Sequence, residues 1–288
     1  ISMAFNFQVF KTRTLTAIVF AAVMLFGLFL NTWSYFILFT LIQFGCWYEY
    51  QKLMSVIFPS YQKISIAQQL TYPFCGFLLM LYTSGLLNNF YVDNKNGFIG
   101  LLVALMAIIE ILFFRKDSFK KIAVSLGGFL YISISITSMV SFRFSGNYFS
   151  GTEFHFDMGL FIPVLLIATI WINDTMAYIV GSFIGKTPLT KISPKKTWEG
   201  TIGGALLAMI VVSMLAYFLF AADFLLMIFF TFIAVVSGTF GDLFESKLKR
   251  LANVKDSGNF MPGHGGFLDR FDSLLFAAPA VWVLMQFF

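Results

Sequence analysis

The sequence has little of the charge that a water-soluble protein carries on its surface. Only 11% of its 288 residues are charged, whereas about a quarter are charged in an ordinary soluble domain. Hydrophobic residues make up 59% of the chain, and its mean hydropathy is +0.84. This composition excludes a soluble globular domain. Uninterrupted apolar runs of roughly 20 residues predict an all-α integral membrane protein instead.

Cysteine and histidine are also scarce, which limits the metal and redox chemistry available. The two cysteines, Cys46 and Cys75, lie in or beside apolar runs without paired spacing, so we expect small buried hydrophobic side chains. The two histidines, His155 and His264, are far apart, and neither has a second histidine or a cysteine at ligand spacing. A disulfide framework and a zinc site are therefore not expected.

The apolar runs predict nine transmembrane helices. Alternating polar positions, which a membrane β-barrel requires, are missing from these runs. Very short connections at 31–32 and 221–223 predict that spans 1 and 2, and spans 7 and 8, form helical hairpins. The predicted spans are 14–30, 33–48, 68–88, 97–114, 122–142, 158–184, 200–221, 224–244 and 271–288.

The distribution of cations predicts the orientation of the chain in the membrane. With nine spans, 17 of the 19 lysines and arginines fall on one side, and only Lys95 and Arg143 on the other. Positive residues concentrate in cytoplasmic loops, so we expect a cytoplasmic N-terminus and a C-terminus on the opposite side. The net charge of +5 then reflects membrane topology, and no nucleic-acid partner is expected.

A polar loop with the sequence "GKTPLTKISPKKTWEG" follows the sixth predicted span, from Gly185 to Gly200. Lys195 and Lys196 precede Thr197, which is a suitable N-cap for the next helix. Lysines beside a helix N-terminus favour binding of a polyanion, because the helix dipole adds to their charge. The alternative is that these lysines only anchor the loop to lipid headgroups.

A second polar region, from Glu245 to Asp272, faces the same side, because two spans separate it from the first loop. Acidic residues crowd the ends of spans 8 and 9 there, and two pairs have i,i+3 spacing. Carboxylates on adjacent helices suit a hard divalent cation. The alternative is salt bridging to nearby lysines and arginines. The acids are Asp242, Glu245, Asp256, Asp269 and Asp272.

Asn173, Asp174 and Glu110 lie within predicted spans, and one histidine lies in a glycine-rich turn. Asp174 is costly inside an apolar helix, so a substrate or metal role is expected. Asn173 is open to either polar helix packing or substrate binding. Glu110 is expected to pair or to reach the membrane surface. His264, within "PGHGG", is open to phosphate contact, proton transfer or a structural hydrogen bond.

Together these features predict a cytoplasm-facing pocket with lysines for phosphates, carboxylates for Mg²⁺, and apolar helices for a lipid. Such a pocket suits phosphoryl or nucleotidyl transfer to a lipid. An ion-coupled transporter that uses Asp174 and Asp242 as relay sites is the alternative from another class, although no convincing internal repeat supports it. Gly200, Gly203 and Gly204 favour close helix packing, either within one chain or in a homodimer.

The run from Ser246 to Ser273, "SKLKRLANVKDSGNFMPGHGGFLDRFDS", resembles the signature of the phosphatidate cytidylyltransferase (CDP-diacylglycerol synthase) family. Met261 stands where that signature usually has Leu, Ile or Phe, a conservative departure. The segments "NDTMAYIVG", "SPKKTWEG" and "GDLFESKLKR" are also similar to family segments. The resemblance is dense from about residue 163 to 280. It covers the signature positions Ser246, Lys249, Arg250, Lys255, Asp256, Pro262, His264, Gly265, Gly266, Asp269, Arg270 and Asp272.

The resemblance implies an enzyme that converts CTP and phosphatidic acid into CDP-diacylglycerol and pyrophosphate with Mg²⁺, to which a second cation such as K⁺ can be added. A CTP-dependent lipid or polyprenol kinase is the related alternative. The family resemblance also implies an N-terminal membrane region, 1–157, and a catalytic region, 158–288. The implied location is a bacterial cytoplasmic membrane. The implied metal ligands are Asp242, Asp269 and Asp272, joined as catalytic residues by Lys255, His264 and Arg270. The implied substrate-binding residues are Asn173, Asp174, Ser193, Lys195, Lys196, Thr197, Glu199, Lys249, Arg250 and Asp256.

Overall fold

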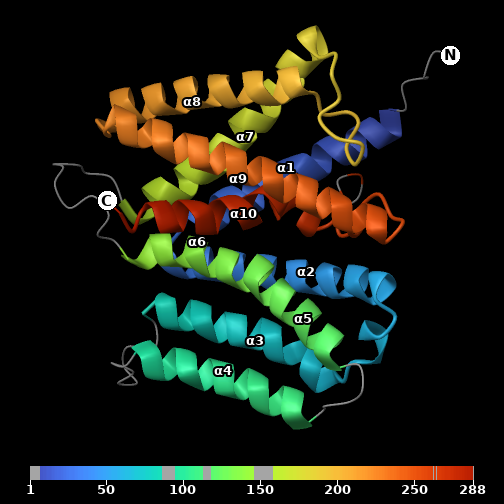
Figure 1. Cartoon of the computed structure of the whole chain (residues 1–288). Coiled ribbons are helices and arrows are strands. Elements are labelled where there is room, and N and C mark those ends of the chain that lie inside the picture. The colour runs from blue at the N-terminus through green and yellow to red at the C-terminus, as the bar shows by residue number, and fades with distance from the viewer. Residues whose placement is uncertain are drawn as a thin grey trace.

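The computed structural model describes residues 7–85, 95–112, 118–145, 158–261, 263 and 265–287, and helices dominate this part of the chain (Figure 1). Each predicted apolar span overlaps a helix. In chain order the α-helices are α1 (Phe7–Phe29), α2 (Thr32–Ile57), α3 (Ile66–Thr83), α4 (Lys95–Leu112), α5 (Ser118–Gly128), α6 (Ile134–Ser145), α7 (Met158–Ile184), α8 (Trp198–Phe220), α9 (Phe224–Leu251) and α10 (Leu268–Leu284).

Two short elements complete the description. A 3₁₀ turn, η1 (Tyr61–Lys63), follows α2, and a π-helical turn, η3 (Phe129–Ser133), joins α5 to α6. Four segments are long and apolar enough to cross a membrane: 119–144, 159–184, 198–220 and 224–251. Shorter apolar helices occur at 14–29 and 98–112. The helical, strongly apolar chain is therefore an integral membrane protein.

The predicted hairpin turns are confirmed, and side chains cap the helices that follow them. Asn31 accepts a hydrogen bond from the Ser34 backbone N–H at 2.8 Å at the start of α2. Asp223 accepts one from Leu226 at 2.7 Å at the start of α9. Ala221 adopts a left-handed conformation (φ 45°) at the end of α8, which lets the chain reverse within three residues.

Several helices extend beyond the predicted apolar spans. The span predicted at 33–48 is helical from Thr32 to Ile57, and the one predicted at 224–244 continues to Leu251. The last helix begins at Leu268 rather than 271. The extension of α2 carries charged residues that interrupt the apolar run, but it also supplies core residues such as Leu53 and Met54. These extensions carry Glu49, Glu245 and Lys249.

The helices are layered, with α8 and α9 on one side, α10 and α6 in the middle, and α3 and α4 on the other side (Figure 1). The largest buried side chains include Trp47, Tyr35 and Phe39 of α2 and Phe142 of α6. By contrast, α8 exposes Ile202, Leu206 and Ile210, among other large apolar side chains. An exposed apolar helix face of this kind suits contact with lipid.

Small residues pack α8 against α7 within the chain. A Cβ atom at Gly204 would lie 2.5 Å from the backbone N of Ala177, and one at Gly200 would lie 2.8 Å from its backbone O. Gly203 lies against Val180 in the same way, at 2.6 Å. These glycines therefore serve an intramolecular contact, which was one of the two possibilities in the sequence. Cys46 and Cys75 are free and buried, as predicted.

Candidate functional site

The loop between α7 and α8 and the loop between α9 and α10 lie at the same end of the helix bundle (Figure 1). The first loop is closed at its base by an antiparallel bridge between Pro188 and Thr197. The Thr197 side chain accepts a hydrogen bond from the Gly200 N–H at 3.1 Å and caps α8. The predicted capping role of Thr197 is thus confirmed, and the cap fixes the lysines that precede it.

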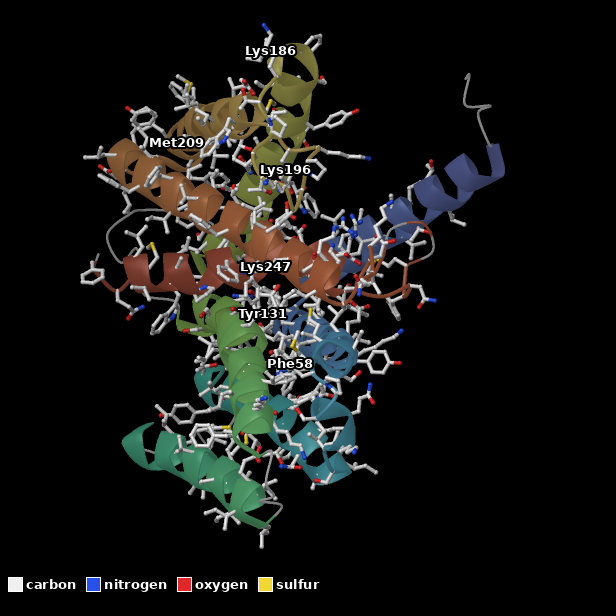
Figure 2. The ribbon with its side chains drawn as sticks, turned by 45° about the vertical axis from the view of Figure 1, so that its right-hand side comes forward. Phe58, Tyr131, Lys186, Lys196, Met209 and Lys247 are labelled. Carbon is white, nitrogen blue, oxygen red and sulfur yellow. The ribbon has the colours of Figure 1, made fainter. Side chains whose placement is uncertain are left out.

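A cavity of about 420 Å³ lies between α7, α8, α9 and the first loop. Figure 2 shows Lys196 between α7 and α9, whereas Lys186 is at the outer tip of α7. The polar side chains that line the cavity come from segments up to 69 residues apart (173 to 242). The predicted site residues among them are Asn173, Asp174, Ser193, Lys195, Lys196, Thr197 and Asp242. The structure adds Tyr178, Ser182, Thr201 and Thr239.

Opposite charges face each other in this cavity. Lys196 forms an ion pair with Asp242, and both side chains are partly buried. Burial lowers the pKa of Lys196, and the nearby carboxylates of Asp174 and Asp272 oppose this shift. Asn173 is buried on the cavity wall, and its Oδ1 has no hydrogen-bond partner in the described protein. The cavity therefore presents two lysines and several oxygen acceptors to a ligand.

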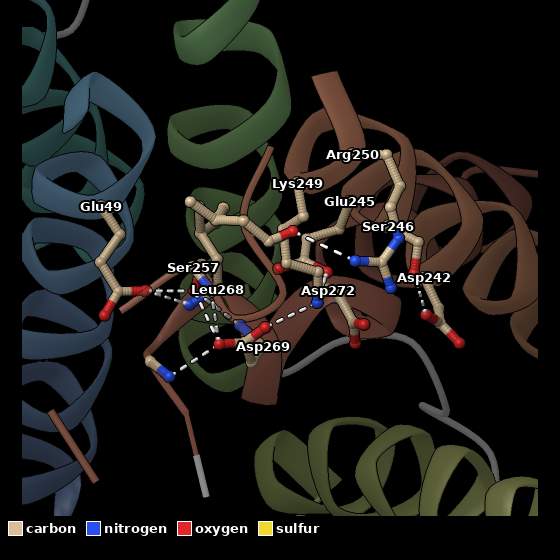
Figure 3. A network of polar contacts seen from close by, with 12 residues as sticks. Glu49, Asp242, Glu245, Ser246, Lys249, Arg250, Ser257, Leu268, Asp269 and Asp272 are labelled. Atoms are coloured by element: carbon tan, nitrogen blue, oxygen red, sulfur yellow. Dashed lines mark hydrogen bonds and ion pairs between the residues drawn. The ribbon is translucent and has the colours of Figure 1, made fainter. Parts of the chain in front are cut away.

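A second polar cluster lies beside the cavity, around Lys249 on α9 (Figure 3). Lys249 forms ion pairs with Glu245 and, at 2.6 Å, with Asp269. Glu245 is fully buried, and apart from this ion pair its carboxylate oxygens accept no hydrogen bond from the described residues. Ser246 lies 3.3 Å from Asp242 and connects the cluster to the cavity.

Asp269 is held by the chain around it. Its Oδ2 accepts hydrogen bonds from the backbone N–H of Ser257 and of Gly266, both at 2.8 Å, and from the Ser257 hydroxyl at 2.9 Å. Its Oδ1 accepts from Lys249. With four donors on two oxygens, Asp269 fixes the loop between α9 and α10.

The positions of the acidic side chains limit how a metal ion could be bound. Within the described residues, no three histidine, cysteine or acidic side chains come together in a group that holds a metal ion. Asp242 and Asp174 nevertheless place carboxylate oxygens on the cavity wall. Mg²⁺ is usually bound by one or two carboxylates together with substrate phosphates and water. The donor set thus fits Mg²⁺ completed by a phosphate ligand. Of the three predicted metal ligands, Asp242 lines this cavity, whereas Asp269 and Asp272 do not.

Several predicted site residues lie outside the cavity lining. Glu199 instead accepts hydrogen bonds from the backbone N–H of Lys186 and Thr187 at 3.2 Å and braces the first loop. Arg250 is exposed and donates to the Val254 carbonyl at 3.2 Å. Lys255 and Asp256 are also exposed, farther along the loop. For these residues sequence proximity to the site did not bring the side chain into the cavity.

Three further predicted residues remain, and the structure describes two of them. Arg270 lines a small hollow with Phe20 and Trp171, which is separate from the cavity. Asp272 accepts from the Ser273 N–H at 2.6 Å and acts electrostatically on Lys196. His264, with Pro262, is outside the described residues.

A buried acid beside the cavity was also not among the predicted site residues. Glu49 on α2 is only 3% exposed, and it accepts hydrogen bonds from Ser257, Phe267 and Leu268. The sequence could have indicated this role, because an acid at the end of an apolar run is costly unless it is paired. Glu110, by comparison, accepts from Gln68 at 2.8 Å and Tyr72 at 3.0 Å, so it pairs within the N-terminal half, as expected.

The amino-acid sequence is similar to those of known proteins. A sequence profile of the cytidylyltransferase family matches residues 11–288. The phosphatidate cytidylyltransferase of Bacillus subtilis is 34% identical over 213 residues, which are 67% of this chain and 79% of that protein. The one from Helicobacter pylori strain J99 is 42% identical over 131 residues, 46% of this chain and 49% of that protein.

A plant relative, the chloroplastic phosphatidate cytidylyltransferase 4 of Arabidopsis thaliana, is 42% identical over 137 residues, 47% of this chain and 35% of that protein. The chain thus spans about half the length of the Helicobacter pylori relative and less of the plant one. The family match nevertheless extends over nearly the whole sequence. This chain belongs to the cytidylyltransferase family.

Proposed function

We propose that this protein transfers the cytidylyl group of CTP to phosphatidic acid and releases CDP-diacylglycerol and pyrophosphate. The observation that carries the proposal is the 420 Å³ cavity, in which Lys195 and Lys196 face Asp174 and Asp242. Cations for a triphosphate and carboxylates for a divalent ion meet there, on helices whose outer faces are apolar. Family membership and the names of the relatives support the same reaction.

In the proposed reaction a phosphate oxygen of phosphatidic acid attacks the α-phosphorus of CTP. A new P–O bond forms, and the bond from the α-phosphorus to the α–β bridging oxygen breaks, so that pyrophosphate leaves with the electron pair. The phosphate of the lipid is already an anion, so the chain needs no activated serine or cysteine. Lys195 and Lys196 hold the triphosphate and offset its charge, because cations in a partly buried site interact strongly with phosphate oxygens.

The ion pair between Lys196 and Asp242 fits an exchange of partners on substrate binding. Lys196 then contacts a phosphate, and Asp242 is released to act as a metal ligand, with Asp174 or Asp272 as the second carboxylate. Mg²⁺, when bound, offsets the negative charge on the phosphate oxygens. We also propose that a second cation such as K⁺ binds there, because several acids lie near the site.

The membrane arrangement is part of the proposal. Nine spans place both polar loops on the cytoplasmic side of a bacterial inner membrane, where CTP is available. In support, α1 begins at the loop end of the bundle and α10 ends at the opposite end (Figure 1). We also propose that the chain consists of an N-terminal region, 1–157, and a catalytic region, 158–288, and that it forms a homodimer.

The test is an assay of the purified chain with CTP and phosphatidic acid, with and without Mg²⁺. Formation of CDP-diacylglycerol and pyrophosphate in equal amounts, lost on chelation of Mg²⁺, is the expected result. Formation of CDP and a phosphorylated lipid would identify a CTP-dependent lipid kinase instead. Absence of CTP turnover under all conditions would contradict the proposed reaction.

A further inference from the structure

A buried carboxylate from the N-terminal half of the chain reaches the loop that leads into α10. Glu49 lies on α2, about 200 residues away in sequence, and its carboxylate accepts hydrogen bonds from the backbone N–H of Phe267 at 2.9 Å and of Leu268 at 3.0 Å. These donors are at the N-terminus of α10, where unpaired N–H groups and the helix dipole favour a negative charge. Glu49 therefore acts as the N-cap of α10 from another helix.

The same carboxylate is coupled to Asp269 through one hydroxyl group. Ser257 Oγ lies 2.7 Å from Glu49 Oε2 and 2.9 Å from Asp269 Oδ2, and Ser257 is buried. Asp269 in turn contacts Lys249 at 2.6 Å. A continuous chain of polar contacts thus joins α2 to the Lys249 cluster on α9 (Figure 3).

The backbone around Glu49 is shaped to let the loop approach it closely. A Cβ atom at Gly258 or at Gly266 would overlap with the Glu49 carboxylate. One turn earlier on α2, a Cβ at Gly45 would lie 2.6 Å from the ring of Phe267. The segment of α2 from Gly45 to Glu49 therefore packs closely against the loop at Gly258 and Gly266, and Glu49 is at the centre of this contact.

We propose that Glu49 is a positioning residue for the cytidylyl transfer proposed above. It fixes the N-terminus of α10 and the Ser257–Asp269 contact, and so sets where Asp269, Asp272 and Lys249 stand relative to the cavity. Glu49 itself is absent from the cavity lining, so it acts through these residues. Because misplacement of reacting groups by about 1 Å can cost about 100-fold in rate, a contact of this kind controls turnover.

The test compares Glu49→Gln with Glu110→Gln in the full-length membrane protein. Both residues are buried acids of the N-terminal half, but Glu110 accepts its hydrogen bonds from Gln68 and Tyr72, which lie in that same half. We expect Glu49→Gln to lower kcat by about 10- to 100-fold with little change in KM for CTP, because Lys195 and Lys196 are on a different loop. Glu49→Asp should fall in between, and Glu110→Gln should affect thermal stability but not kcat.

A readout independent of activity is hydrogen exchange at the amides that the network uses. Glu49→Gln should speed exchange at Phe267, Leu268, Ser257 and Gly266, and Glu110→Gln should not. If the wild-type chain does not turn over CTP, the proposed reaction fails while this exchange result still decides the role of Glu49. An unchanged kcat and unchanged exchange in Glu49→Gln would overturn the inference.

A double-mutant cycle covers the case in which Glu49→Gln folds poorly. Glu49→Asp and Ser257→Ala should each reduce kcat, and the two together should reduce it by less than the product of the single effects, because they interrupt the same contact. Multiplicative effects, or losses that only follow the amount of folded protein, would overturn the positioning role.

Discussion

Lys196 in the loop before α8 and Asp242 on α9 form an ion pair across the cavity. The two residues are 46 positions apart in the sequence (196 to 242), and a helical hairpin separates them. Their contact joins the predicted phosphate-binding loop to the predicted metal-binding helix. It brings the first polar loop and the acidic part of α9 into one site.

Replacement of Asp242 by asparagine tests the metal proposal. Asp242→Asn keeps the shape of the side chain but removes the charge, and we expect Mg²⁺-dependent CDP-lipid formation to fall by about 100-fold or more. Asp223→Asn is the matched control. Asp223 caps α9 at its other end, and asparagine caps a helix equally well. Similar activity in both variants would remove Asp242 from the metal site.

Replacement of Lys196 by alanine tests the phosphate-binding role. A hydrogen bond to a charged group contributes about 1.5–3 kcal/mol, so KM for CTP should rise at least about tenfold. Lys191, an exposed lysine of the same loop outside the cavity lining, is the control. A KM for CTP that is the same in Lys196→Ala and Lys191→Ala would contradict the assignment.

Asp269 and Asp272 should differ in their effects when each is changed to asparagine. Both variants are expected to lose activity. Asp269→Asn also places an NH₂ group against the donors from Ser257, Gly266 and Lys249, which should cost about 1–3 kcal/mol of stability. Thermal unfolding in detergent should therefore show a lower Tm for Asp269→Asn than for Asp272→Asn. Equal Tm values with substantial activity in both would refute the roles of these two acids.

A methyl group at Gly266 should disturb the contact with Glu49. Gly266→Ala introduces a Cβ that overlaps both carboxylate oxygens, and overpacking of this kind costs about 1–3 kcal/mol. We expect lower kcat and lower Tm. Gly100→Ala is the control, since nothing lies within 4 Å of its added Cβ, and alanine in a helix is favoured over glycine by about 0.5–1 kcal/mol. A Gly266→Ala enzyme with wild-type kcat would mean that the loop adjusts freely.

Much of the fold followed from the sequence because the apolar runs are long and their breaks are distinct. The turn at Ala221–Asp223 and the cap at Thr197 were both predicted from local residues, and local contacts form them. Helix ends were less accurate. Beyond residue 48, α2 is amphipathic and no longer uniformly apolar, with Leu53 and Met54 buried. Donors from the distant loop stabilise the buried carboxylate of Glu49.

The site was predicted in part. Lysines and acids near the ends of the spans indicated a polyanion and a divalent ion, and Asp174, Lys196 and Asp242 do share a cavity. Glu199 did not follow the prediction, because its carboxylate turns back to the N–H groups of Lys186 and Thr187. The direction of a side chain depends on the donors that surround it, and those donors are not visible in a linear pattern.

The sequence by itself determined that this protein is a helical membrane protein with two polar regions at one end, since hydropathy and charge depend only on composition and order. The tertiary structure decided which charges meet. Lys249 takes Glu245 and Asp269 as partners, Lys196 takes Asp242, and Glu49 crosses from α2 to hold the start of α10. These pairings depend on helix packing, because a buried charge is stable only where the folded chain supplies its partner.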